Sequence, residues 1–186
     1  MFGNFIADSI KGKQSQQYPE SVQLGIRIHQ FIDAFTDGHE QVLQSRRRLY
    51  PHFGKYAGVV QDIFYDHFLA LSWPSYHPMP LDEFAERVYR VIEAQSELLN
   101  ERSRRTFRHM STHNWLLNYR EEQGIDRALK GMAYRASYPS NMENAIPVLR
   151  THFEELQSDY SSFFPELKRA VFERYESKVR QLNPPS

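Results

Sequence analysis

The sequence has 186 residues, with 23 basic and 23 acidic side chains and no cysteine. A chain of this length accommodates one compact domain with a buried core, so we expect a single domain. The balanced charge gives no indication of a nucleic-acid-binding protein. The lack of cysteine excludes disulfides and thiolate metal ligands, which leaves histidine, aspartate and glutamate as strong candidate ligands.

The hydropathy pattern does not support a membrane span or export. No run of about 18 apolar residues is present, and the amino terminus lacks the basic-then-apolar pattern of a secretory signal. We therefore expect a cytoplasmic protein that does not associate with membranes.

Apolar residues recur at helical spacing along the chain, and no two-residue alternation bounded by hairpin turns interrupts them. Proline or glycine near residues 38, 51–54, 74–80 and 124 separates the periodic segments, as does the stretch 138–141. The pattern predicts an all-α bundle of about seven to nine helices in residues 1–182, followed by a frayed tail at 183–186. The predicted helices span residues 4–11, 22–35, 40–49, 56–73, 81–100, 113–122, 125–136, 143–160 and 165–182.

The segment GIRIHQFIDAFTD carries a polar stripe on an otherwise apolar helix. His29, Asp33 and Asp37 are spaced by four and four residues, so at about 100° per residue they share one face. Charged groups among apolar neighbours are costly unless something compensates them. A bound cation is one such compensation.

A second apolar helix repeats this pattern in the segment QDIFYDHFL. Asp62 and Asp66 are four residues apart, and His67 follows directly. Histidine and carboxylate side chains that project from two helices of a bundle can hold one divalent cation and leave positions open for water. The alternative is that His29 and His67 are hydrogen-bonded core histidines and that the aspartates cap helices or pair with arginines such as Arg27 and Arg120.

The amino-terminal segment GNFIAD places Asn4 and Asp8 four residues apart. Asp8 is either a further metal ligand or a group that orients a histidine, whereas the alternative is a solvated first helix capped by Asn4. No Gly-rich phosphate loop, nucleophile elbow or dinucleotide fingerprint is present, which argues against P-loop, serine-esterase and nicotinamide chemistry.

Arginines cluster in two runs. One comprises Arg46, Arg47 and Arg48, and the other comprises Arg102, Arg104, Arg105 and Arg108. Such runs are usually solvated helix faces. Beside a functional site they would attract an acidic partner, a phosphate or a nucleic acid, so the runs alone do not indicate which of these binds.

Taken in order, GNFIAD with Lys11-Gly12, GIRIHQFIDAFTD, DIFYDHFLALSW, NWLLNYR and LKGMAYR resemble the acyl carrier protein phosphodiesterase family. The resemblance implies an all-helical fold related to the HD metal-dependent phosphohydrolases. It also implies hydrolysis of the phosphodiester that joins 4′-phosphopantetheine to a serine of the acyl carrier protein. The implied cofactor is a divalent cation, with manganese preferred and magnesium or iron as alternatives.

Carried over residue by residue, the resemblance assigns the candidate site. The implied metal ligands are His29, Asp33, Asp62, Asp66, His67 and Asp8, with Asp37 as a further candidate. The implied catalytic residues are Asp33, Asp66, His67 and Arg120. The implied substrate contacts are Asn114, Arg120 and Arg135, and Trp115 either shapes the wall of the site or packs structurally. The acidic recognition helix of an acyl carrier protein would suit either the cluster of Arg46, Arg47 and Arg48 or the cluster from Arg102 to Arg108.

Family members usually begin with a segment resembling NFLAH that precedes the GN motif, and this chain begins instead at Met1-Phe2-Gly3. We therefore expect the opening segment of the family to be absent here, which leaves two alternatives open: weak metal binding or inactivity, or a true start further upstream. Two rival functions stay open: a metal phosphohydrolase that acts on a nucleotide or another small phosphate ester, and a non-catalytic helical binding protein. The oligomeric state does not follow from the sequence.

Overall fold

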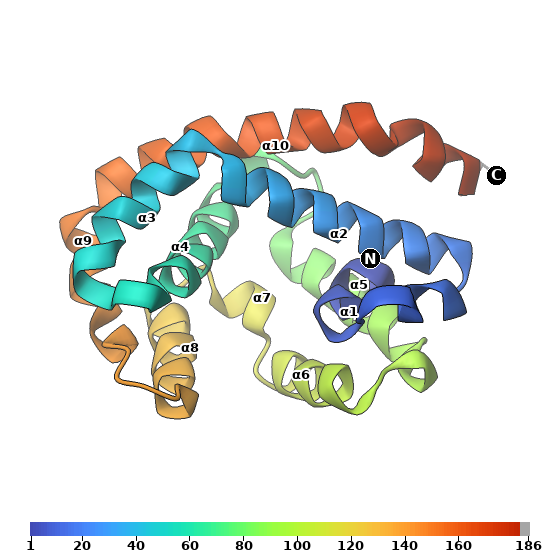
Figure 1. Ribbon diagram of the computed structural model, residues 1–186, viewed down its shortest axis with the longest axis horizontal. Helices are drawn as coiled ribbons and strands as arrows, with labels where there is room; N and C mark the ends of the chain where they lie inside the picture. The colour runs from blue at the N-terminus through green and yellow to red at the C-terminus, as the bar shows by residue number, and fades with distance from the viewer. Residues whose placement is uncertain (183–186) are drawn as a thin grey trace. The chain divides into compact units, whose positions relative to one another are not determined.

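The computed structural model describes residues 1–182, and these residues form helices and no strand (Figure 1). The all-α prediction is therefore confirmed for the described chain. The predicted frayed tail at 183–186 lies outside the described residues. Residues 1–182 contain ten α-helices: α1 (Phe2–Ile6), α2 (Glu20–Gly38), α3 (Glu40–Phe53), α4 (Ala57–Ser72), α5 (Leu81–Glu93), α6 (Glu101–Thr112), α7 (Trp115–Asn118), α8 (Glu122–Arg135), α9 (Ala145–Thr151) and α10 (Phe153–Leu182).

The helices form two compact units whose segments alternate along the chain. The first unit contains Met1–Gly38, Glu86–Thr112 and the described residues from Phe164 onward. The second contains His39–Ala85 and His113–Phe163. The expectation of a single domain stays a prediction, and each unit is described by itself below.

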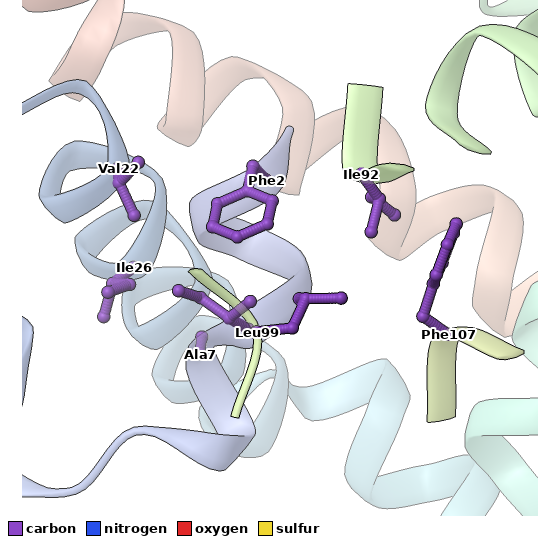
Figure 2. Packing of buried hydrophobic residues seen from close by; sticks show 8 residues of the cluster. Phe2, Ala7, Val22, Ile26, Ile92, Leu99 and Phe107 are labelled. Atoms are coloured by element: carbon purple, nitrogen blue, oxygen red, sulfur yellow. The ribbon is translucent and has the colours of Figure 1, made fainter. Parts of the chain in front are cut away.

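In the first unit, α1 packs lengthwise against α2 around a small apolar core. Figure 2 shows Phe2 of α1 between Val22 of α2 and Ile92 of α5, and Phe107 of α6 belongs to the same cluster. The contact between α1 and α2 is close because Gly3 and Gly25 meet there: a Cβ on Gly25 would lie 2.9 Å from Gly3 Cα. This approach fixes the start of the chain against α2.

In the second unit, α4 is the central helix and packs against α3 and α8. Its buried residues include Phe64 and Phe68, which have 0% and 1% of their surface exposed. The same core contains a polar network in which Ser45 Oγ donates a 2.8 Å hydrogen bond to Asp159 Oδ2. Arg48 also pairs with Asp159, so this buried carboxylate has both a hydroxyl and a guanidinium partner.

Periodicity predicted α2 and α4 to within a few residues, whereas several other boundaries were wrong. Residues 113–122 form only the short α7, because Asn114 adopts a left-handed conformation with φ 44° that interrupts a helix. The helix α6 was not predicted. Gly124 was expected to separate two helices but lies inside α8, where a Cβ would come 1.8 Å from Asn118 O. Its role is therefore close packing.

The predicted gap between residue 160 and a helix starting at Pro165 was also wrong, because α10 runs from Phe153 through Pro165. Proline at this position removes the hydrogen bond to the carbonyl of Ser161. Both residues are exposed, so water can take the place of the missing donor. Pro51 lies inside α3 in the same way. None of the described helices combines the length and apolar character that crossing a membrane requires.

Candidate metal centre and its surroundings

Three side chains of the first unit converge where the turn after α1 meets α2. His29 Nε2 lies 3.0 Å from Asp8 Oδ1 and 3.2 Å from Asp33 Oδ2. One ligand atom from each of the three residues can be chosen so that all lie within 4.8 Å of one another. Among residues 1–182 this is the single group of three or more such side chains that meets that distance.

Local structure explains how the three side chains meet. His29 and Asp33 are one helical turn apart on α2, so they point to the same side. Asp8 lies in η1 (Ala7–Ser9), a 3-10 turn that continues directly from α1. The contact of Gly3 with Gly25 holds α1 against α2, and this contact brings Asp8 to His29.

The carboxylates of this cluster carry an electrostatic cost. Desolvation raises the pKa of Asp33, and the negative charges of Asp8 and Asp37 raise it further, while His29 lowers it. Asp37 contributes to the electrostatic field at Asp33, but it does not belong to the three-residue cluster. A divalent cation would relieve the repulsion because its positive charge offsets the carboxylates. One imidazole nitrogen with two carboxylate oxygens suits manganese or iron better than magnesium, which prefers oxygen donors.

The second unit holds His67 in a buried and oriented position. Only 3% of its surface is exposed, and its Nδ1 lies 2.7 Å from the Tyr119 carbonyl oxygen. A carbonyl can only accept, so Nδ1 carries the proton and donates it to this bond. In the neutral ring the lone pair is therefore on Nε2, the arrangement that positions a histidine as a metal ligand or a base.

Asp62 and Asp66 lie on the exposed side of α4. Although solvent reaches Asp66, the protein atoms around its carboxyl group remove enough water to raise its pKa to about 7, and Asp62 adds repulsion. His67 follows Asp66 directly but is buried, because consecutive helical residues point about 100° apart. The structure thus places the aspartates and His67 on different sides of one helix.

The predicted arginine contacts differ in how they are held. Arg46 Nε donates to Gln61 Oε1 at 3.3 Å, Arg47 Nη1 lies 3.2 Å from Glu40, and Arg48 pairs with Asp159. Arg120 and Arg135 are exposed, whereas Asn114 and Trp115 are half-buried. The substrate-binding role of these residues stays a prediction.

One pair near His67 had no signal in the sequence. Arg150 of α9 donates to Glu122 of α8 at 2.6 Å and 3.1 Å, and these hydrogen bonds lower the pKa of Glu122. His67 lowers it further through its charge, so Glu122 lies in the field of His67. The two residues are 28 positions apart, and neither belongs to a local motif that could have indicated the pair.

Comparison with known proteins identifies the family. The family model described as acyl carrier protein phosphodiesterase matches residues 1–167, which include every candidate site residue above. The chain belongs to this family. No solved structure matches it.

Curated relatives agree along most of the chain. An acyl carrier protein phosphodiesterase of Klebsiella pneumoniae is 31% identical over 168 residues, covering 90% of this chain and 87% of the relative. An acyl carrier protein phosphodiesterase of Enterobacter is 32% identical over 170 residues, covering 89% and 86%. One of Photorhabdus laumondii is 30% identical over 166 residues, covering 89% and 84%.

Proposed function

We propose that this protein hydrolyses the phosphodiester bond between 4′-phosphopantetheine and the serine of an acyl carrier protein. The products are the apo-carrier and free 4′-phosphopantetheine. Family membership over residues 1–167 carries the proposal, because the relatives are named for this class of substrate and reaction. We further propose a cytoplasmic location, with which the absence of cysteine is compatible.

We propose that Asp8, His29 and Asp33 hold a divalent cation, and that manganese is the metal. Their spacing supports this assignment, since their ligand atoms lie within 4.8 Å of one another without any sulfur donor. When bound, such a cation supplies Lewis acidity, which draws charge from the phosphoryl oxygens and favours attack by water. The chain's own groups provide positioning and proton transfer.

The second unit offers the groups for proton transfer. His67 presents a basic Nε2 because its Nδ1 proton is held by the Tyr119 carbonyl. Asp66, with a pKa raised to about 7, can carry a proton near neutral pH and release it. The family resemblance assigns His67 and Asp66 to catalysis, and we propose that one of them transfers the proton and that Arg120 neutralises phosphate charge. Asp62, Asp66 and His67 stay metal ligands only as the family resemblance implies them.

Mass spectrometry of the carrier protein tests the reaction. With manganese added, we expect holo-carrier to lose its phosphopantetheine, and we expect Asp33→Asn and Asp66→Asn to abolish that loss. Asp126→Asn is the matched control, because Asp126 only forms a surface pair with Lys130 four residues away. Loss that continues in the presence of a chelator would contradict the role of the metal.

The same purified protein distinguishes the two alternative functions from the proposed one. Turnover of a nucleotide or another small phosphate ester, with holo-carrier left intact, would support the alternative phosphohydrolase. A protein that binds the carrier but neither binds metal nor hydrolyses a substrate would support the non-catalytic hypothesis.

A further inference from the structure

The helix α6 carries a concentration of positive charge in a chain of zero net charge. Four arginines lie on this helix, all of them exposed, and Glu101 is its one acidic residue. The buried residues of α6 are Ser103 and Phe107. At about 100° per residue, Arg102 and Arg105 point away from Phe107 and Arg108 points to the flank, so the charge faces solvent.

The arginines of α6 differ in their availability. Arg104 Nη2 donates to the carbonyls of Ser96 and Leu99, both at 3.2 Å, and thus secures the preceding turn. Arg105 lies 3.5 Å from Glu101, but both side chains are more than 70% exposed, so water screens this pair. Within residues 1–182, the side chains of Arg102 and Arg108 form no hydrogen bond or ion pair. They are open to a partner.

The helix is also tied to the segment that carries Asp8. Asn100, which precedes α6, donates from Nδ2 to the Ser9 carbonyl at 3.0 Å, and Ser9 follows Asp8 in sequence. Phe107 contacts Phe5 of α1 edge-to-face, with ring centroids 6.1 Å apart. A molecule bound along α6 is therefore held beside the segment of the candidate metal centre, within one compact unit.

We propose that Arg102, Arg105 and Arg108 form a docking face for an acidic helix of the carrier protein. This inference rests on the proposed function and names the surface that recruits its substrate. Residues three apart on a helix rise about 4.5 Å, so three guanidinium groups at this spacing match carboxylates three or four apart on a partner helix. Each arginine can hold a carboxylate through two parallel hydrogen bonds.

Charge reversal at the two open arginines tests the docking face. Arg102→Glu with Arg108→Glu should raise the KM for holo-carrier by on the order of tenfold or more and weaken direct binding of apo-carrier equally. It should leave kcat and the turnover of a small chromogenic phosphodiester unchanged. The wild-type KM should rise with salt, and the variant's KM should rise less steeply.

The matched control is Arg169→Glu with Lys178→Glu, which makes the same change in net charge on exposed residues of α10. An equal rise in KM in the control would show that the effect comes from net charge alone, and this result would overturn the docking face. An unchanged KM in the α6 variant would also overturn the docking face. Binding of single-stranded DNA that depends on α6, without carrier binding, would assign the face to a nucleic acid instead.

The docking face and the proposed reaction fail separately. If wild-type protein releases no phosphopantetheine, the proposed function fails, and the binding of apo-carrier by wild type and variant still decides the docking face. If wild type releases phosphopantetheine normally, and the α6 variant binds the carrier as tightly as the α10 control variant does, the proposed reaction stands and the docking face is wrong.

Discussion

Gly3 and Gly25 lie in backbone contact where α1 meets α2, and this contact determines where Asp8 stands. A Cβ on Gly25 would come 2.9 Å from Gly3 Cα, and a Cβ on Gly3 would come 2.0 Å from Val22 O. No other residue type permits this approach without moving a helix. The position of Asp8 beside His29 therefore depends on two glycines that are not themselves candidates for chemistry.

Replacement of Gly25 by alanine should separate α1 from α2. We expect a loss of about 1–3 kcal/mol in the free energy of unfolding, as for overpacked cores. Manganese affinity should fall as well, because Asp8 moves away from His29. Urea denaturation and calorimetric titration measure the two effects. The control is Gly38→Ala at the end of the same helix, where nothing lies within 4 Å of the added Cβ; a similar loss there would rule out the close contact as the cause.

Asp33→Asn should affect stability and metal binding in opposite directions. Because the pKa of Asp33 is raised in the fold, its ionised form at pH 7 opposes folding when no metal is present. In chelator we therefore expect an equal or higher Tm for the variant. With manganese we expect a lower Tm than wild type, since a ligand is lost. Equal stabilisation of both proteins by manganese would refute the proposed ligand role.

Asp66 should make the stability of the metal-free protein depend on pH. Its folded pKa of about 7 exceeds the ordinary aspartate value of about 4, so the protonated form favours the fold. This contribution is complete below about pH 4 and is lost as pH rises to about 7. Urea titrations in chelator should show that the free energy of unfolding of Asp66→Asn increases relative to that of wild type as the pH rises from about 4 to about 7. A constant difference between pH 4 and 7 would show that the pKa is not raised.

Asp159→Ala should be among the most damaging changes in the second unit. Asp159 is 7% exposed and accepts from both Ser45 and Arg48, so its removal leaves a largely buried guanidinium without its partner. We expect a loss of about 3 kcal/mol in the free energy of unfolding. Glu40→Ala breaks the exposed pair with Arg47, and we expect that change to cost under about 1 kcal/mol. Chemical denaturation compares the two, and equal losses would contradict a structural role for the buried pair.

The sequence determined features whose causes lie within a few residues. Apolar periodicity placed α2 and α4, and four-residue spacing put His29 and Asp33 on one helix face. The family resemblance likewise depended on short motifs such as GIRIHQFIDAFTD, which the family match over residues 1–167 confirms.

Only the tertiary structure decided what depends on distant segments. The meeting of Asp8 with His29 spans 21 positions and requires the close approach of two glycines, which periodicity does not encode. Gly124 was expected to separate two helices but lies in the first turn of α8, where it packs against Asn118. A helix was expected to begin at Pro165, but α10 runs through this residue, and the exposed carbonyl of Ser161 can bind water instead. Local propensity amounts to about 1–3 kcal/mol at such positions, so contacts made elsewhere in the fold can outweigh it.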